Sequence, residues 1–401
     1  MEISESKEYT FEDNIPGGPL KIAALAGARD LAGLVDGHIA RVRCEDGALR
    51  EARLNDPMYD GYYRDSYLLD FDCTRFGTGE AKCVLRESVR GKDVFAMVDI
   101  TNFSLTYSCC GQTNYMSPDN HFQDLKRLIG CCGTAKRVSV IMPFLYEGRQ
   151  HKRARRESLD CAIALQELVS MGVNNIITFD AHDPRVQNAV PLSSLDNFMP
   201  TYQFIQSLLA REKNLQIDKD HLMIISPDEG AMGRSVYFAN NLGVDIGMFY
   251  KRRDYSTVVN GRNPIVSHEF LGQSVKGKTV IIVDDMISSG ESMLDTCREL
   301  KDRGAARVVV CCTFGLFTDG LEKFDDYYSQ GYFDYVITTN LIYRIPELKT
   351  REWYIEADMS RFLAAIINAM NHDVPMGNSL SPTSRIQRLL RRYREEQKIS
   401  G

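Results

Sequence analysis

The chain has 401 residues, of which 44% are hydrophobic and 25% are charged, and its formal net charge is -6. A chain of this length can bury large cores and favours two or three domains over one. The small negative charge does not favour nucleic acid or an anionic membrane as a partner, and no run of about 18 apolar residues predicts a membrane span. We therefore expect a globular protein that binds neither nucleic acid nor membranes.

Cysteine usage and the first residues indicate the compartment. Eleven cysteines occur, three times as adjacent pairs, and no two of them have the C-x-x-C spacing of zinc or redox sites. Reduced thiols of an intracellular protein are the better interpretation. Residues 1–13 are polar and acidic and lack the apolar core of a signal peptide. These features predict a cytoplasmic protein.

The order of elements along the chain is typical of an α/β fold. Short β-rich runs alternate with helical patterns, which favours parallel sheets. Apolar residues recur at helical spacing over 159–172 and 292–304, and each segment ends in a glycine suited to a helix C-cap. The predicted strands are 93–100, 137–144, 174–182, 221–230, 245–252, 279–286, 306–315 and 333–340.

These strands fall into two groups, one before about residue 190 and one from about residue 222 to 340. The grouping predicts two α/β domains of similar kind, each a mainly parallel sheet flanked by helices. Residues 108–122 and 255–264 are rich in turn formers, and we expect them to be polar excursions. The basic segment 384–398 predicts an amphipathic terminal helix.

The segment 279–292 combines a buried strand with two adjacent acids, Asp284 and Asp285, and a hydroxyl-rich turn. A loop followed by a helix N-terminus directs backbone N–H groups at an anion, which favours a phosphate. The paired acids can accept hydrogen bonds from the two hydroxyls of a sugar. Together these groups predict a site for ribose 5-phosphate, and a plain Asp-capped turn is the alternative. The expected phosphate contacts are Ser288, Ser289, Gly290 and Ser292.

The segment 280–292 resembles the phosphoribosyl-pyrophosphate loop of the type I phosphoribosyltransferase fold. Further stretches between Lys21 and Asn340 resemble the ribose-phosphate diphosphokinase family, also called phosphoribosyl-pyrophosphate synthetases. Residues 86–91, RESVRG, are the most specific of them, and the shared order of all the stretches adds to the resemblance. The stretches are 75–95, 142–153, 176–182, 224–234, 249–254 and 312–317.

This resemblance implies two phosphoribosyltransferase-like domains: residues 1–200, joined by the C-terminal segment 353–401, and residues 201–352, which carry the ribose-phosphate loop. It implies a diphosphokinase that transfers the diphosphoryl group of ATP to ribose 5-phosphate and releases AMP. The implied cofactor is Mg²⁺, and the implied partners are ATP and ribose 5-phosphate. The implied assembly is a homo-oligomer built from dimers, with hexamers among the expected forms.

The resemblance assigns ATP contacts to two segments. Phe76 matches an aromatic residue that stacks on adenine, and Glu80 matches an acid that accepts a hydrogen bond from the adenine amino group. Arg149 and Gln150 match a nucleotide-contacting Arg-Gln pair, and an arginine fork suits a phosphate or a ring face. A solvated basic run is the alternative for the second segment.

The resemblance also implies a metal site and two catalytic cations. A buried structural histidine and ordinary turn aspartates are the alternatives for the metal site. Lys251 and Arg253, which begin a polar excursion, are implied to stabilise charge at the transferred phosphorus. The implied metal-proximal residues are Asp180, His182, Asp196 and Asp228.

Two other functions stay open. Residues 288–292 read Ser-Ser-Gly-Glu-Ser, which is closer to the loop of transferases that consume phosphoribosyl diphosphate. A catalytically silent regulatory homologue is the third function, although the presence of His182 and Lys251 argues against it. The sequence assigns no role to the additional segments 44–72 and 376–401.

Overall fold

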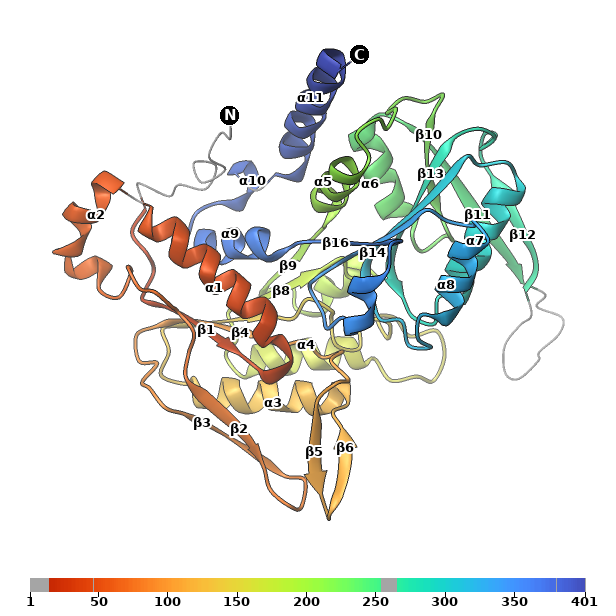
Figure 1. Cartoon of the computed structure of the whole chain (residues 1–401). Helices are drawn as coiled ribbons and strands as arrows, with labels where there is room; N and C mark the ends of the chain where they lie inside the picture. Colours follow the sequence, from red (N-terminus) through yellow and green to blue (C-terminus); the bar gives the residue numbers. More distant parts are fainter. Residues whose placement is uncertain (1–13, 46, 254–264, 380, 401) are drawn as a thin grey trace. The chain divides into compact units, whose positions relative to one another are not determined.

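The structure is a computed structural model that describes residues 14–45, 47–253, 265–379 and 381–400 (Figure 1). It divides into two compact units. Unit 1 comprises Met1–Met199, Asn340–Tyr343 and Asp358–Ser381, and unit 2 comprises Pro200–Thr339, Arg344–Ala357 and Pro382–Gly401. Only part of the expected C-terminal segment therefore belongs to unit 1, because residues 353–357 and 382–401 cluster with unit 2 instead.

Unit 1 is built on a parallel sheet of five strands, in the spatial order β1-β4-β7-β8-β9. β1 and β4 are buried along their whole length, as expected for strands covered on both faces. The strands are β1 (Leu20–Ala24), β4 (Asp93–Met97), β7 (Arg137–Ile141), β8 (Asn175–Phe179) and β9 (Ser194–Phe198).

Helices cover both faces of this sheet (Figure 1). α3 (Pro118–Cys131) and α4 (Asp160–Ser170) share one hydrophobic cluster with alternate strand residues such as Val94 and Ala96. α1 (Arg29–Cys44) and α9 (Ser360–Asn371) contact each other on the other face. There, Phe362 of α9 lies 6.4 Å from Phe179 of β8, measured between ring centroids. The last helix of unit 1 thus completes the core that the first strands begin.

Two antiparallel ribbons extend from unit 1. The first joins β2 (Phe71–Arg75) to β3 (Ala81–Leu85), and the second joins β5 (Thr106–Cys109) to β6 (Gln112–Tyr115). Positive φ angles at Cys110 and Gly111, 52° and 78°, form the two-residue turn of the second ribbon. The expected polar excursion 108–122 is therefore mostly a β-hairpin followed by the start of α3, because strand pairing satisfies its polar backbone.

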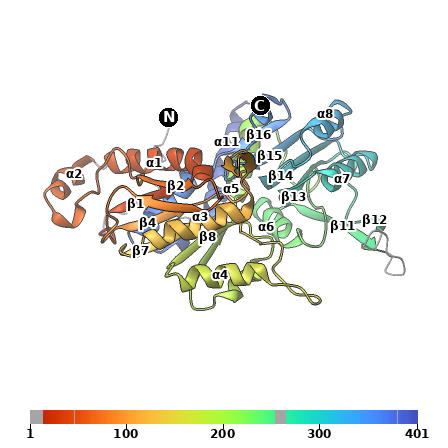
Figure 2. The ribbon, with the colours of Figure 1, turned by 90° about the horizontal axis from the view of Figure 1, so that it is seen from below.

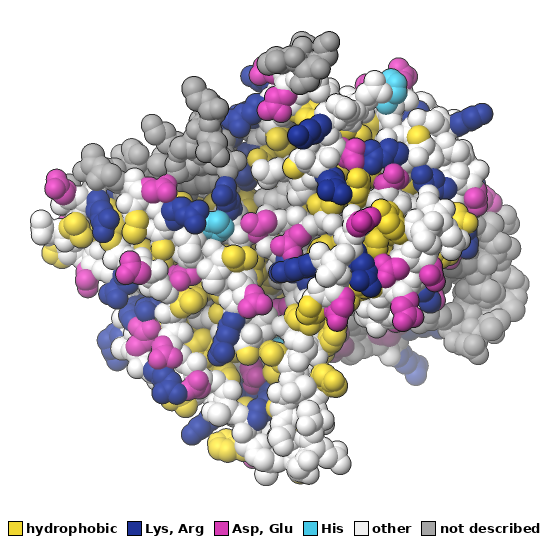
Figure 3. Space-filling model, in the orientation of Figure 1, with side chains coloured by type: hydrophobic (Ala, Val, Ile, Leu, Met, Phe, Trp, Pro, Cys, Tyr) yellow, Lys and Arg dark blue, Asp and Glu magenta, His cyan; other side chains and the backbone are white. Residues whose placement is uncertain are grey.

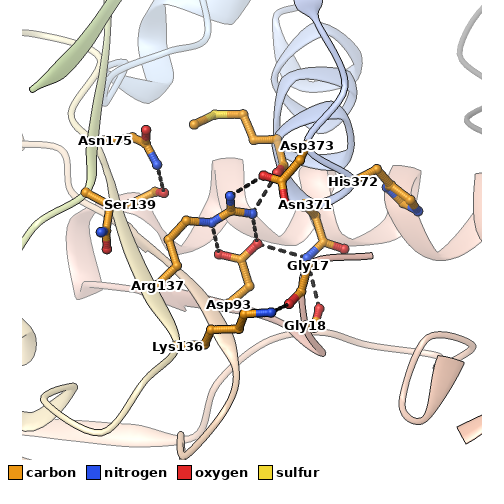
Figure 4. A network of polar contacts seen from close by, with 12 residues as sticks. Gly17, Gly18, Asp93, Lys136, Arg137, Ser139, Asn175, Asn371, His372 and Asp373 are labelled. Carbon is orange, nitrogen blue, oxygen red and sulfur yellow. Dashed lines mark hydrogen bonds and ion pairs between the residues drawn. The ribbon is translucent and has the colours of Figure 1, made fainter. Parts of the chain in front are cut away.

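A polar network connects the first residues of β4 and β7, two inner strands of the unit 1 sheet, with the end of α9 (Figure 4). The Arg137 guanidinium donates to both oxygens of Asp93, with nitrogen–oxygen distances of 2.9 and 2.5 Å, and it also pairs with Asp373. Asn371 donates to Asp93 at 2.9 Å and to the backbone oxygen of Gly18 at 3.0 Å. Segments more than 200 residues apart in sequence are therefore joined within one unit.

Unit 2 contains a seven-stranded sheet in the order β12-β11-β10-β13-β14-β15-β16, parallel except for the β11–β12 pair. The chain leaves β10 toward β11 on one side and returns to β13 on the other. This reversal is a topological switch point between β10 and β13. The strands are β10 (Leu222–Ser226), β11 (Asp245–Arg253), β12 (Ile265–Leu271), β13 (Thr279–Ile287), β14 (Arg307–Gly315), β15 (Tyr335–Thr339) and β16 (Tyr354–Ala357).

Alternate residues of β13 face two different hydrophobic clusters, as the two-residue period of a strand requires. Ile282 belongs to the cluster with α7 (Glu291–Asp302) and α8 (Glu322–Ser329). Ile281 and Val283 belong to the cluster with the remaining long helices, on the opposite side of the strands (Figure 2). These helices are α5 (Thr201–Arg211), α6 (Met232–Leu242) and α11 (Pro382–Ser400).

The predicted terminal helix is present as α11, and its packing explains why it belongs to unit 2. Its apolar residues Ile386, Leu390 and Tyr393 are buried against α5 and the sheet. The Tyr393 hydroxyl accepts a hydrogen bond from the Leu215 backbone N–H at 2.7 Å and donates one to the Glu212 backbone oxygen at 2.8 Å. Through these contacts α11 belongs to unit 2, whereas the segment before it packs in unit 1.

The expected fold class is confirmed, since both sheets are mainly parallel and flanked by helices. All eight predicted strands and all three predicted helices are present. Lysine, arginine and acidic side chains are interspersed on the face shown in Figure 3. No helix in the described part of the chain is long and apolar enough to cross a bilayer. The remaining helices are α2 (Gly47–Leu54), α10 (Met376–Ser379) and the 3₁₀ segments Ala26–Ala28, Pro57–Tyr59, Pro184–Ala189 and Pro346–Thr350.

Candidate functional site

The paired acids lie in the strand at the switch point of the unit 2 sheet. Asp284 and Asp285 fall near the carboxyl end of β13, and the loop with Asp228 follows β10, the neighbouring strand on the other side of the switch point. In open α/β sheets, ligands bind outside the carboxyl ends of the strands at such a point. The fold of unit 2 therefore directs these acids to the place where a ligand is expected.

A buried arginine faces both acids. Arg234, in the first turn of α6, places Nη1 3.5 Å from Oδ1 of Asp284 and 3.7 Å from Oδ1 of Asp285. Arg234 is not among the site residues predicted from the sequence, although it ends the stretch 224–234 that resembles the family. The sequence offered one signal for it, namely a cation shortly after a glycine and an acid at the end of a predicted strand. Its charge offsets part of the repulsion between the two carboxylates.

The acid pair is held in an unfavourable electrostatic state. Burial raises the pKa of Asp284 well above its usual range, the neighbouring Asp285 raises it further, and Arg234 opposes the change. Asp285 is only 3% exposed, whereas Asp284 is half-buried. A ligand that donates hydrogen bonds to these oxygens would relieve the cost of burying them. The hydroxyl pair of a ribose has that property.

Asp228 shapes the loop between β10 and α6. Its Oδ1 accepts hydrogen bonds from the backbone N–H groups of Gly230 at 2.9 Å and Ala231 at 3.2 Å. The Ser226 hydroxyl donates to the Asp228 backbone oxygen at 2.7 Å. The charge of Asp228 also raises the pKa of Asp284, as a smaller contribution than burial and Asp285. Asp228 is thus a turn former in the loop after β10, the strand that pairs with β13.

The loop after β13 has the geometry of an anion site. Gly290 has φ 86° and precedes α7, and a Cβ placed on it would lie 2.4 Å from Cζ of Phe324. Only glycine fits there, both for its conformation and for its packing. Glu291 points outward and pairs with Lys323 at 2.5 Å. The negative charge that follows the glycine is therefore neutralised at the surface, away from the loop backbone.

The serine residues of this loop differ in their exposure to solvent. Ser288 and Ser289 are half-buried, and Ser292, in the first turn of α7, is exposed. The Ser288 backbone oxygen accepts a hydrogen bond from the Thr318 N–H at 3.0 Å, which fixes the loop against the segment after β14. The structure thus holds the predicted sugar-phosphate residues in one loop directly after the acid pair.

In unit 1, the proposed adenine contacts share one turn. The turn between β2 and β3 is closed by a hydrogen bond from the Phe76 N–H to the Glu80 backbone oxygen at 2.7 Å. The Phe76 ring is 48% exposed, and Nζ of Lys82 lies 5.8 Å from its centroid. The Thr78 hydroxyl donates to Oε2 of Glu80 at 3.1 Å. An exposed ring and an exposed acid therefore share this turn, and their contacts with adenine stay a prediction.

The loop after β7 meets the end of β8. Arg149 is exposed, and the side chain of Gln150 donates to the Ser158 backbone oxygen at 2.7 Å. The next residue, His151, places its ring centroid 5.4 Å from that of His182 and its Nε2 3.2 Å from Oδ2 of Asp183. The loop with Arg149 and Gln150 therefore adjoins the segment with His182 and Asp183 in unit 1.

The metal-proximal residues expected in unit 1 lie on or after two neighbouring strands, β8 and β9. Asp180 follows β8, is buried, and has φ 38°, which is uncommon for a residue other than glycine. His182 is exposed. Asp196 pairs in register with Ile177, three residues before Asp180. It lies two residues before the end of β9, and the next residue, Asn197, accepts a hydrogen bond from the Ala181 N–H at 3.0 Å.

A preassembled metal cluster is absent from the described residues. Among them, no three or more His, Cys, Asp or Glu side chains are grouped so that they could hold one ion. The assignment of Mg²⁺ ligands therefore remains a prediction from resemblance.

The expected catalytic cations lie at the edge of the described chain. The backbone of Lys251 pairs with His268, and that of Arg253 pairs with Ile265, where β11 adjoins β12. The side chains of Lys251 and Arg253 lie outside the described part, as does the excursion 254–264, which contains most of the predicted lid. Their catalytic role stays a prediction.

Two family models match separate parts of the chain. The N-terminal domain of ribose phosphate pyrophosphokinase matches residues 20–172, and the phosphoribosyl transferase domain matches residues 194–339. A ribose-phosphate pyrophosphokinase from Prochlorococcus marinus is 28% identical over 275 residues, which are 67% of this chain and 74% of the relative. That of Vibrio parahaemolyticus is 27% identical over 309 residues, which are 76% of this chain and 88% of the relative.

A solved structure supports the fold. The phosphoribosylpyrophosphate synthetase from Mycobacterium smegmatis superposes with a TM-score of 0.68 at 21% identity, over 88% of this chain and 99% of that chain. The fold and the acid-pair site define a protein with phosphoribosyltransferase-type domains. With both domain models matched in sequence order, the chain belongs to the ribose-phosphate pyrophosphokinase family.

Proposed function

We propose that the chain is a ribose-phosphate diphosphokinase, which converts ATP and ribose 5-phosphate to 5-phosphoribosyl 1-diphosphate and AMP. Family membership supports this function. The observation that carries it is the acid pair of β13 at the switch point, followed directly by the Gly290 loop. The two features offer acceptors for a sugar diol and donors for a phosphate, and ribose 5-phosphate needs both.

In the proposed reaction, the anomeric hydroxyl of ribose 5-phosphate attacks the β-phosphorus of ATP. The bond from that phosphorus to the α,β-bridging oxygen breaks, AMP leaves, and the sugar hydroxyl loses its proton. Such chemistry depends mainly on positioning and on neutralising charge. Asp284 and Asp285 would orient the sugar, and Lys251 and Arg253 would stabilise charge on the transferred group.

The proposed ATP site uses the exposed turn and the loop of unit 1. Phe76 would stack on adenine, and Glu80 would accept a hydrogen bond from its amino group. Arg149 and Gln150 would contact the nucleotide at the place where their loop meets the end of β8. The exposure of Phe76 and Arg149 in unit 1 supports these roles, since both side chains are accessible to a ligand.

We propose that magnesium enters bound to ATP. Mg²⁺ keeps several waters in proteins and is held by one or two carboxylates together with substrate phosphates. Asp180 and His182, which follow one strand, are the residues we assign to this ion in unit 1, where it would neutralise triphosphate charge. We further propose that the chain forms homo-oligomers built from dimers, which light scattering on the purified protein would measure.

The deciding experiment is incubation of the purified protein with ATP, Mg²⁺ and ribose 5-phosphate. We expect AMP and 5-phosphoribosyl 1-diphosphate in equal amounts. Absence of AMP, together with base-dependent release of diphosphate from phosphoribosyl diphosphate, would instead identify a phosphoribosyltransferase. Absence of both reactions would identify a catalytically silent homologue.

A further inference from the structure

Two cysteines face each other across the first ribbon of unit 1. In the β2–β3 register, Cys73 lies directly opposite Cys83. Backbone hydrogen bonds run from Phe76 to Glu80 and from Arg86 to Asp70, at pairs three positions to either side of the cysteines. Because hydrogen-bonded and non-hydrogen-bonded pairs alternate, Cys73 and Cys83 form a non-hydrogen-bonded pair.

That type of pair has the spacing of a disulfide. Opposed residues of a non-hydrogen-bonded pair have Cα atoms about 4.5 Å apart, and disulfides span Cα separations of about 4.4 to 6.8 Å. The thiols are free, and both residues are half-buried, so small oxidants can reach them. The backbone therefore needs no large movement for a sulfur–sulfur bond to form.

The surroundings favour Cys73 as the reactive partner. A hydrogen bond from the Cys83 thiol lowers the pKa of Cys73, and Arg127 and Arg75 act in the same direction, whereas burial and Asp124 oppose it. Hydrogen bonding to Cys73 raises the pKa of Cys83. The two thiols thus lie in hydrogen-bonding contact on the ribbon, and the nearby charges of Arg127 and Arg75 favour the thiolate form of Cys73.

We propose that Cys73 and Cys83 form a reversible disulfide, which makes the β2–β3 ribbon a redox-modified segment. A hydroperoxide oxidises the Cys73 thiolate to a sulfenic acid and is itself reduced to water or an alcohol. The Cys83 sulfur then attacks the sulfenic sulfur, its proton leaves with the hydroxyl as water, and the sulfur–sulfur bond forms. A dithiol reductant reverses the modification and is oxidised to its own disulfide.

The consequence concerns the turn that the ribbon carries. Phe76 and Glu80 lie in that turn, three residues from the cysteine pair on each strand. A covalent link between the two strands fixes their separation next to the turn. Resting on the proposed function, this inference implies that oxidation alters the KM for ATP, whereas the formation of the disulfide does not depend on that function.

Three neighbouring cysteines provide internal controls. The Cys131 thiol donates to the Cys83 backbone oxygen at 3.4 Å and is the nearest competing partner of Cys83. Cys109 and Cys110 have sulfur atoms 3.9 Å apart but are adjacent in sequence, in a hairpin turn. A disulfide between adjacent residues would strain the turn, so we expect this pair to stay reduced under mild oxidation.

The test is peptide mass spectrometry of the full chain after mild treatment with hydrogen peroxide. Cleavage after lysine and arginine places Cys73 in peptide 65–75 and Cys83 in peptide 83–86. We expect these two peptides to become linked, with loss of two free thiols, and dithiothreitol to release them. Cys131→Ser should keep the link, and Cys73→Ser should abolish it without unfolding the protein, because serine is nearly isosteric with cysteine.

A link between Cys83 and Cys131, or between Cys109 and Cys110, in place of the expected one would overturn the proposal, as would persistence of both thiols while other cysteines oxidise. The KM for ATP is then compared between oxidised and reduced protein. We expect a change in the wild type and none in Cys73→Ser. A linked protein without any diphosphokinase activity would contradict the proposed function and leave the disulfide established.

Discussion

Nη1 of Arg234 lies 3.5 Å from Oδ1 of Asp284, and this cation is the counter-charge to an acid pair in which one carboxylate is almost fully buried. Removing one partner of a buried ionic contact leaves the other charge uncompensated and costs about 3 kcal/mol. We therefore expect Arg234→Ala to lower the free energy of unfolding by about that amount, measured by denaturant titration.

The pH dependence of the free energy of unfolding distinguishes a lost charge pairing from lost packing in Arg234→Ala. Because the pKa of Asp284 is raised, lowering the pH neutralises it earlier than an ordinary carboxyl. The loss in free energy of unfolding caused by Arg234→Ala should therefore be largest above that pKa, and it should decrease as the pH falls through it. Arg234→Met, which keeps much of the apolar volume, should show the same pH-dependent deficit. A deficit in Arg234→Ala that does not vary with pH would point to lost packing.

Asp284→Asn should separate stability from binding. A carboxyl whose pKa is raised on folding destabilises the protein as the pH rises from its ordinary pKa through the folded value, and it costs nothing at lower pH. The amide should thus raise the melting temperature at neutral pH by roughly a few degrees, with no gain in acid. The KM for ribose 5-phosphate should rise roughly ten- to a hundredfold, while the KM for ATP changes little.

Equal effects of Asp284→Asn on both substrates would contradict the sugar assignment. Asp285→Ala provides a second measurement on the other acid of the pair. It should raise the KM for ribose 5-phosphate in the same range.

Gly290→Ala should damage the sugar-phosphate loop. The new methyl group must enter the space of the Phe324 ring in a backbone conformation that favours glycine. Overpacking combined with a positive φ should lower stability by about 1 to 3 kcal/mol and raise the KM for ribose 5-phosphate. Gly277→Ala is the matched control, because its φ is 76° but nothing lies within 4 Å of the added Cβ.

A double variant tests the cause of the Gly290→Ala defect. Phe324→Leu alone leaves a smaller side chain in the core, and combined with Gly290→Ala it should recover part of the lost stability. If the two defects simply add, the clash with Phe324 is not the reason.

His182→Ala should displace the magnesium requirement of ATP binding to higher concentration. We expect this shift because the imidazole follows the same strand end as Asp180 and adjoins the nucleotide loop through His151. Calorimetric titration of ATP at several Mg²⁺ concentrations measures it. His221→Ala, an exposed histidine that pairs with Asp218 in unit 2, is the control. An unchanged magnesium titration with a lower melting temperature would make His182 a structural residue.

Lys251→Ala and Arg253→Ala should each lower kcat by about a hundredfold or more, with KM values shifting only a few-fold. This is the scale of losing one electrostatic stabiliser of a developing charge. Arg252→Ala is the neighbouring control and should retain most of the activity. If all three variants behave alike in steady-state kinetics, the end of β11 has no catalytic role.

The strands and the acid-pair loop could be predicted because local sequence determines them. The β-branched run before Asp284 and the glycine after it identify a strand and a tight loop without any tertiary information. The sequence shows a cation shortly after a strand-end acid, but the contact of Arg234 with the acid pair depends on how α6 packs next to β13, so this residue was missed. The grouping of Asp196 with Asp180 came from resemblance and stays a prediction.

Other differences have the same physical origin. Residues 106–115 contain mostly polar residues and turn formers, so their hydrophobic pattern is weak. Their strands are stabilised by pairing with each other and by the hydrogen bond from the Cys110 N–H to the Gly77 backbone oxygen. The C-terminal segment was assigned to one domain because a helix pattern does not indicate its partner. The buried residues of α11 pack in unit 2, while Phe362 of α9 packs in unit 1.

The position of α9 in the chain has a consequence for protein synthesis. A ribosome makes the sheet strands of unit 1 early, but Phe362 and Asn371, which cover Phe179 and hold Asp93, emerge only after nearly all of unit 2. Domains generally fold as units, from the N-terminus onward, while the chain is being made. Until α9 has been synthesised, one apolar face of the unit 1 sheet is incompletely covered. Slowing translation between residues 200 and 358 should therefore lengthen the period in which nascent chains are prone to aggregate.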